Sequence, residues 1–155
     1  FIATSSDGYI ATPDGRVDWL DNAGKVDADM RQNTDMGFAE FINSVDCMIM
    51  GRKCMAVISS FNIPAEQWPY RDINALVNKR SKIGLKHAYI DGGTTIISFI
   101  NLKLINEMTI TRAPLLLGDG LPLFGKTNHS VKLEDTKSVV FPNDFIQVKY
   151  RVNYL

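Results

Sequence analysis

The stretch Tyr89-Ile90-Asp91-Gly92-Gly93-Thr94-Thr95-Ile96-Ile97 predicts a short apolar strand that passes through two glycines into a helix. Because glycine has no β-carbon, the backbone of such a junction can approach a ligand closely. The helix that follows points its unpaired N–H groups and the positive end of its dipole at the same place. This pattern is typical of a phosphate or pyrophosphate site. It is also typical of a plain tight turn, so the surrounding sequence has to decide between the two.

A second junction of the same kind lies upstream. Residues 47–50 form an apolar run typical of a strand buried on both faces, and Gly51-Arg52-Lys53 follows it directly. Ligands of open α/β sheets bind at the carboxyl ends of strands, and two junctions there suit the two ends of a dinucleotide. Arg52 and Lys53 carry charge suited to the 2′-phosphate that distinguishes NADP from NAD, although a solvated charge pair at a helix start is the alternative. No G-x-G-x-x-G fingerprint occurs in the chain.

The order of the expected elements indicates one mixed α/β domain over residues 1–155. Apolar periodicity predicts strands at 1–4, 9–11, 47–50, 73–77, 88–90 and 108–111, and helices over 38–45, around 56–58 and over 94–104. Strict alternation over 146–154, after the turn Pro142-Asn143-Asp144, predicts an antiparallel hairpin with 138–141.

One connection is too short for this arrangement. Parallel strands at 73–77 and 88–90 need a crossover of about a dozen residues or more, and only 78–87 lie between them. We therefore expect that a segment of the natural chain is missing near residues 79–84. We also expect a trimmed N-terminus, because Phe1 already lies inside a predicted strand.

Composition and charge exclude several classes of protein. Lys+Arg and Asp+Glu are both 17, so net charge points neither to nucleic acid nor to an anionic membrane surface. No apolar run approaches the roughly 20 residues of a membrane span. Cys47 and Cys54 are expected to be free thiols of a reducing compartment, which places the protein in the cytoplasm. His87 and His129 lie far apart in a chain without a Cys/His cluster, so no metal site is expected.

Six motifs together resemble the dihydrofolate reductase-like superfamily, specifically the branch typified by the bacterial riboflavin-biosynthesis reductase domain. In chain order they are Ser6-Asp7-Gly8-Tyr9-Ile10-Ala11, Asp18-Trp19-Leu20, Val45-Asp46-Cys47-Met48-Ile49-Met50-Gly51-Arg52-Lys53, Tyr89-Ile90-Asp91-Gly92-Gly93, Leu104-Ile105-Asn106-Glu107-Met108 and Pro114-Leu115-Leu116-Leu117-Gly118-Asp119-Gly120-Leu121-Pro122-Leu123-Phe124. The resemblance covers most of residues 1–124. It implies an α/β fold of three layers, with a mixed, mostly parallel central sheet, helices on both faces and a C-terminal antiparallel hairpin.

The resemblance implies an NADPH-dependent reductase, often a homodimer, that transfers a hydride to a C=N or C=O group of a small pterin-, pyrimidine- or carbonyl-type substrate. Its cofactor-binding positions carry over as Ala3 and Ile10 beside the nicotinamide, Gly51, Arg52 and Lys53 at the pyrophosphate and adenosine phosphate, Asn78, Lys79, Arg80 and Ser81 near the adenine end, and Gly92, Gly93, Thr94 and Thr95 around the pyrophosphate.

The substrate side is less well defined by the resemblance. Dihydrofolate reductases protonate the pterin from an acid in the first helix, and Asp35 stands near that position, although it also suits a helix cap. Asp7 is a second candidate acid, and equally a turn former before Gly8. Trp19 suits the wall of a flat substrate ring, or simple packing.

Two positions depart from the family pattern. Cys54 stands where a Thr is common, and Asn106 where an Asp is usual. A thiol is a poor substitute for a hydroxyl that binds phosphate. This departure, together with the lack of a clear acid, favours the alternative that the chain is a nucleotide-binding dimeric module without turnover.

Overall fold

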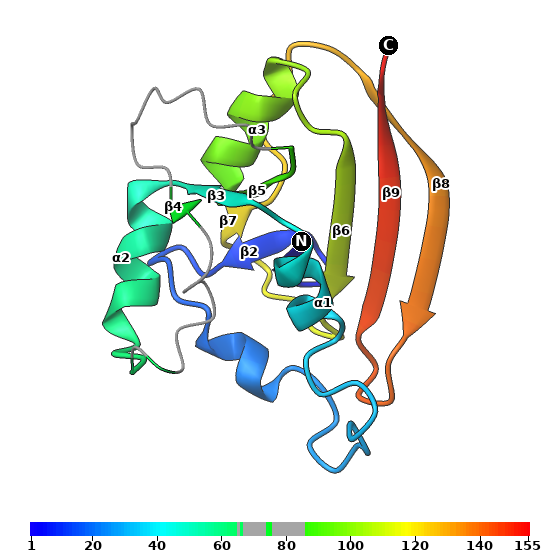
Figure 1. Cartoon of the computed structure of the whole chain (residues 1–155). Coiled ribbons are helices and arrows are strands. Elements are labelled where there is room, and N and C mark those ends of the chain that lie inside the picture. The colour runs from blue at the N-terminus through cyan, green and yellow to red at the C-terminus, as the bar shows by residue number, and fades with distance from the viewer. Residues whose placement is uncertain (65, 67–73, 76–85) are drawn as a thin grey trace.

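A computed structural model describes residues 1–64, 66, 74–75 and 86–155 (Figure 1). Its strands are β1 (Ile2–Thr4), β2 (Tyr9–Ala11), β3 (Cys47–Met50), β4 (Asn74–Ala75), β5 (Ala88–Asp91), β6 (Glu107–Arg112), β7 (Leu121–Pro122), β8 (Val131–Val140) and β9 (Ile146–Tyr154). Its helices are the 3-10 helix η1 (Asp18–Asn22) and the α-helices α1 (Phe38–Asn43), α2 (Arg52–Ser60) and α3 (Gly93–Asn101). No helix within these ranges is long and apolar enough to cross a bilayer.

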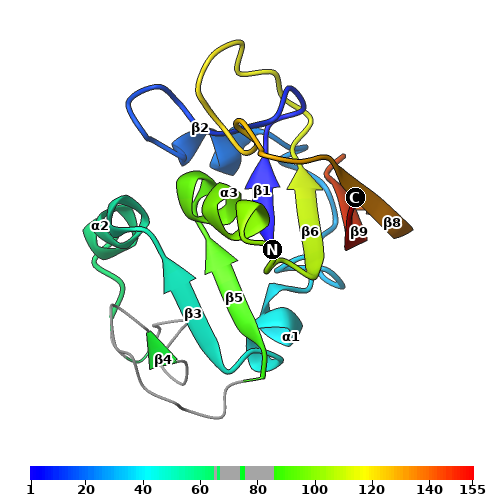
Figure 2. The ribbon, with the colours of Figure 1, turned by 90° about the horizontal axis from the view of Figure 1, so that it is seen from above.

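The strands form a mixed sheet, as predicted. β3 pairs in parallel with β4 and β5, and β1 pairs in parallel with β6. β9 runs antiparallel to both β6 and β8, while β2 and β7 form a small separate ladder. Figure 2 shows β5 beside β1, so the two larger ladders lie edge to edge. The Tyr89 hydroxyl joins them by donating a 2.7 Å hydrogen bond to the Phe1 carbonyl oxygen.

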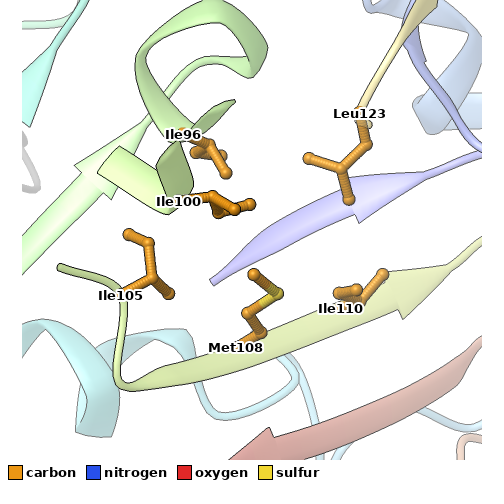
Figure 3. Close-up of a cluster of buried hydrophobic side chains, with 6 residues drawn as sticks. All are labelled: Ile96, Ile100, Ile105, Met108, Ile110 and Leu123. Atoms are coloured by element: carbon orange, nitrogen blue, oxygen red, sulfur yellow. The ribbon is translucent and has the colours of Figure 1, made fainter. Parts of the chain in front are cut away.

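Helices cover both faces of the sheet, which confirms the layered architecture. α2 and α3 lie on one face and α1 on the other (Figure 2). The α3 face holds a cluster of buried apolar side chains from α3, β6 and the segments beside them, drawn in Figure 3: Ile96, Ile100, Ile105, Met108, Ile110 and Leu123. Burying such a side chain stabilises the fold by about 1.5–3 kcal/mol relative to leaving it exposed.

The α1 face has its own aromatic cluster. Tyr89 on β5 packs edge-on against Phe41 of α1, with ring centroids 4.9 Å apart, and Phe1 stacks on Phe41 at 5.2 Å. Val45 and Met48 complete the buried part of the cluster. The strand alternation of period two therefore directs Tyr89 to α1 and Ile90 to α3.

The structure corrects three of the predicted boundaries. The helix expected over 94–104 ends at Asn101, because Lys103 adopts a left-handed φ of +58° and Leu104 turns out to solvent. The short helix expected near 56–58 spans the longer range of α2. The hairpin strand expected at 138–141 begins at Val131, because β9 offers pairing partners along almost its whole length. The predicted strand at 73–77 is described only at β4.

Candidate functional site at the carboxyl ends of β3 and β5

The two predicted glycine junctions lie side by side. Met50 and Asp91 are register partners at the ends of β3 and β5, so α2 and α3 begin at the same level of the sheet. A β-carbon placed on Gly92 would stand 3.9 Å from the amide nitrogen of Gly51. The structure therefore brings together two segments that are about 40 residues apart in the sequence.

Both helices begin without a side-chain cap, judged over the described residues. The first N–H groups of a helix have no partner within it, and the dipole makes this end positive. Two such ends that meet beside glycines suit an anion with more than one phosphate group. Thr95 adds a hydroxyl at this place, with its Oγ1 3.2 Å from the position of a β-carbon on Gly51. The residues present thus fit the pyrophosphate of a dinucleotide.

The packing of the protein itself requires glycine at residue 92 and leaves little room for a side chain at residue 93. Gly92 has a φ of +92°, and a β-carbon there would stand 2.5 Å from the Cys54 Sγ. A β-carbon on Gly93 would stand 3.1 Å from the Cδ1 of Ile10 and 3.2 Å from the carbonyl oxygen of Pro122. The turn and the ligand interpretations of these glycines are therefore compatible, because a side chain at residue 93 would be in tight contact with Ile10 and β7 whether or not a ligand is bound.

The charged residues predicted for the cofactor lie at the start of α2. Arg52 and Lys53 are exposed on its first turn, and neither forms an ion pair with a described residue. Thr94 is likewise exposed on the first turn of α3. The other predicted positions, Asn78, Lys79, Arg80 and Ser81, lie outside the described residues, as does the expected missing segment near 79–84.

The positions predicted for the nicotinamide lie on β1 and β2. Ile10 packs against the core on the α3 face and stands next to Gly93 at the start of α3. Ala3 is the middle residue of β1, paired with Thr111 of β6. Because Figure 2 places β1 next to β5, Ala3 and the end of β5 belong to the same region of the sheet.

Asp7, one of the two predicted acids, connects the loop after β1 to the loop before β7 through hydrogen bonds. Its carboxylate accepts hydrogen bonds from the Ser5 hydroxyl at 2.5 Å and from the amides of Leu117 and Gly118 at 3.2 and 2.8 Å. These bonds, above all the one from Ser5, hold the pKa of Asp7 below its ordinary value. A general acid needs a proton near neutral pH, so this environment favours the turn-forming role.

Asp35, the other predicted acid, caps the start of α1. Its carboxylate accepts hydrogen bonds from the amides of Ala39 at 2.7 Å and Gly37 at 3.0 Å, which lower its pKa. Trp19 lies on η1 and packs into a third apolar cluster with Ala113 and Phe145. The contacts of both residues therefore correspond to the simpler alternatives, a helix cap and packing.

Sequence reasoning missed a third carboxyl group, Asp91. It is half-buried at the end of β5, and burial raises its pKa above the ordinary value. Hydrogen bonds from the Gly92 amide and the Tyr89 side chain oppose this rise. The sequence signal that could have identified Asp91 is its position directly before the glycine pair, because a carboxylate beside a predicted anion site is unexpected.

A cavity of about 300 Å³ lies beside the start of β1 and is also lined by residues of β5, β6 and α3. It is bounded by Phe1, Ala88 and Glu107, at the amino-terminal ends of β5 and β6. Ligands of α/β sheets bind at the opposite, carboxyl edge, where the glycine junctions are. This cavity is therefore distinct from the candidate site.

Comparison with known proteins decides the family. The family described as the RibD C-terminal domain matches residues 58–147, more than half of the chain. The chain belongs to the RibD C-terminal domain family. This confirms the resemblance to riboflavin-biosynthesis reductases and to the dihydrofolate reductase-like fold.

Several relatives of this family member cover nearly its whole length. The crystal structure of a protein assigned to riboflavin biosynthesis from Shewanella sp. PV-4 is 34% identical, with a TM-score of 0.80 over 99% of this chain and 97% of that chain. The uncharacterized protein YyaP of Bacillus subtilis (strain 168) is 26% identical over 185 residues, covering 98% of this chain and 93% of YyaP.

A more distant structure shares the fold. The Thermotoga maritima diaminohydroxyphosphoribosylaminopyrimidine deaminase/5-amino-6-(5-phosphoribosylamino)uracil reductase is 12% identical, with a TM-score of 0.61 over 97% of this chain and 54% of that chain.

Proposed function

We propose that this member of the RibD C-terminal domain family is an NADPH-dependent reductase. The observation that supports this most directly is the pair of uncapped helix N-termini, of α2 and α3, at adjacent strand ends. The proposed reaction is hydride transfer to a C=N or C=O carbon of a small pterin-, pyrimidine- or carbonyl-type substrate. The name of the Thermotoga neighbour, a phosphoribosylaminouracil reductase, favours the pyrimidine class.

NADPH would supply the hydride from its nicotinamide, and the protein would supply position and polarity. The amides that open α2 and α3 would hold the pyrophosphate. Arg52 and Lys53, free of described ion pairs, would pair with the adenosine 2′-phosphate. Ile10 and Ala3 would line the nicotinamide end, because Ile10 lies next to Gly93 at the start of α3 and Ala3 belongs to β1, which lies beside β5 in Figure 2.

The test has two steps. Titration with NADPH, followed by its fluorescence, measures binding without any assumption about the substrate. Loss of NADPH absorbance is then measured with 5-amino-6-(5-phosphoribosylamino)uracil, dihydrofolate and small carbonyl compounds. We expect binding and oxidation with at least one of them. Binding without oxidation would support the non-catalytic nucleotide-binding module, and failure to bind NADPH would contradict both functions.

The expected homodimer remains a proposal, and we assign it to β8 and β9. β8 is the edge strand of its ladder, and it exposes Val139 and Val140. Ile146 of β9, the register partner of Val140, is exposed beside them. A second copy covering these side chains would remove them from water. The proposed compartment is the cytoplasm, in keeping with the free thiols of Cys47 and Cys54.

A further inference from the structure

A row of three register partners crosses the sheet near the carboxyl ends of β1 and β6. Ala3 of β1 pairs with Thr111 of β6, and Thr111 pairs with Gln147 of β9. Register partners project on the same face of a sheet, and alternate residues along a strand share that face. The ring of Phe1, two residues before Ala3, stacks on Phe41 of α1. The row therefore faces the layer of α1.

The side-chain amide of Gln147 joins this row to the segment that precedes α1. Its nitrogen donates one hydrogen bond to the Thr111 hydroxyl and another to the Met36 carbonyl oxygen, both at 3.0 Å. A side-chain amide has two protons, one for each of these acceptors. Thr111 is buried and Gln147 is half-buried, so the two bonds are largely removed from water. Together they fix the distance between Met36 and the sheet.

The backbone of Met36 is in a conformation that needs such support. Its φ is +52°, in the left-handed region that a methionine rarely adopts, and Gly37 follows with a φ of +83°. The Met36 side chain packs into the third apolar cluster, which also holds Trp19. The Asp35 carboxylate accepts hydrogen bonds from the amides of Gly37 and Ala39. The segment 36–38 is therefore held by its side chains, by Asp35 and, from the sheet, by Gln147.

This segment lies over the strand that carries a proposed nicotinamide position. Phe38 packs edge-on against Phe1, with ring centroids 5.5 Å apart, while Met36 is tied to the row that contains Ala3. The dinucleotide positions, at the starts of α2 and α3, lie on the opposite face of the sheet (Figure 2). A substrate that meets a nicotinamide beside β1 from the α1 side would therefore have the segment 36–38 as a wall.

We propose that Gln147 is a positioning residue that sets the affinity of the reductase for its substrate. This inference rests on the proposed function. Gln147 acts through Met36 and does not touch the substrate, because its amide holds the segment 36–38 at a fixed distance from Ala3. The wall of the site is then in place before a flat substrate ring binds. Without the amide, substrate binding would have to order this wall, and the cost would raise KM.

The test compares Gln147→Met and Gln147→Glu with the matched control Asn153→Leu. Methionine has nearly the length of glutamine but no N–H donor, and glutamate has its shape but presents a carboxylate to two oxygen acceptors. Asn153 lies on the same strand and the same face, at the other end of β9, and its amide donates to Glu134 at 3.1 Å. The control therefore loses an amide hydrogen bond away from the site.

The kinetic constants are measured with 5-amino-6-(5-phosphoribosylamino)uracil, dihydrofolate and small carbonyl compounds, as in the assay above. For the compound that the wild type reduces, both Gln147 variants should raise KM about tenfold or more. Their kcat should change less than about threefold and their NADPH Kd less than about twofold, because neither depends on the order of the empty wall. Asn153→Leu should keep the wild-type values of all three constants.

Hydrogen exchange measures the same wall without turnover. The amides of Gly37 and Ala39, which donate to Asp35, should exchange several-fold faster in both Gln147 variants than in the wild type or in Asn153→Leu. A Gln147 variant with the wild-type KM or the wild-type exchange rates would overturn the inference, and a lowered urea midpoint beside that KM would show a structural role alone. Failure of the proposed function would look different, because the wild type itself would then not bind NADPH or not reduce any of the compounds, and the inference would fall with it.

Discussion

The thiol of Cys54 occupies the space that a β-carbon on Gly92 would need, with its Sγ 2.5 Å from that position. The helix α2 therefore packs into a gap that exists only because residue 92 is a glycine. The same residue has a φ of +92°, a conformation that L side chains rarely adopt. Two independent constraints thus act on one residue of the glycine pair.

Gly92→Ala should destabilise the fold strongly. The glycine-type backbone conformation alone costs an alanine about 1–3 kcal/mol, and the contact with Cys54 adds an overpacking cost of about 1–3 kcal/mol. Replacing Cys54 by Ala in the same chain removes the second cost but not the first. We expect urea unfolding of Gly92→Ala/Cys54→Ala to recover part of the loss. Additive effects of the two substitutions would show that the thiol does not limit this position.

The Arg52→Ala and Lys53→Ala variants should lose preference for NADPH over NADH. A cation that pairs with the 2′-phosphate contributes about 1–3 kcal/mol, which corresponds to roughly 5- to 150-fold in affinity. Dissociation constants for both cofactors measure the preference directly. Lys132→Ala on β8 is the control and should change neither constant. If both variants kept the wild-type ratio of the NADPH and NADH dissociation constants, the 2′-phosphate would have to be bound by other residues.

Asp46 should make stability depend on pH in the acid range. Its carboxylate accepts hydrogen bonds from the amides of Lys86 at 2.8 Å and His87 at 2.9 Å, which lower its pKa. A lowered pKa in the folded state means that this contribution is present above the unfolded pKa, about 4, and is lost as pH falls through the folded value.

We therefore expect Asp46→Asn to unfold at lower urea concentration than the wild type at pH 7, with the difference shrinking below pH 4. Asp27→Asn is the control, because Asp27 is exposed and no hydrogen bond or ion pair joins it to the described residues. If the difference in stability stayed constant from pH 7 to pH 3, the loss of stability would come from the altered side-chain packing and not from the lost negative charge.

Val140→Lys should convert the proposed dimer into monomers. Val140 is 69% exposed at the end of β8, where a charge would be buried against the second copy. Sedimentation velocity at several protein concentrations measures the change. Val26→Lys, at a residue that is 91% exposed in the loop after η1, is the matched control and should leave the state of association unchanged. A wild type that sediments as a monomer throughout would contradict the proposal.

Much of the fold could be predicted from local patterns. The strand at 47–50 was predicted with the bounds that the structure shows, because a continuous apolar run followed by glycine is sufficient to define it. The helix after Gly93 was predicted from its periodicity, but its end was not. The helix is followed by Lys103 in a left-handed backbone conformation, which the residue type lysine does not predict. β8 was predicted too short for a similar reason, since its first half is a strand only through pairing with β9.

By itself, the sequence determined the glycine junctions, the order of strands and helices and the family, since these depend on residue type and spacing along the chain. Only the tertiary structure decided the surroundings of each acid. The sequence singles out Asp7 and Asp35 and not Asp91, but the hydrogen bonds that lower the pKa values of Asp7 and Asp35 form only in the fold, as does the burial that raises the pKa of Asp91. The reason is physical. Burial depends on groups that are distant in the chain, and even hydrogen bonds from near neighbours, such as those from Gly37 and Ala39 to Asp35, depend on the backbone conformation of the folded protein.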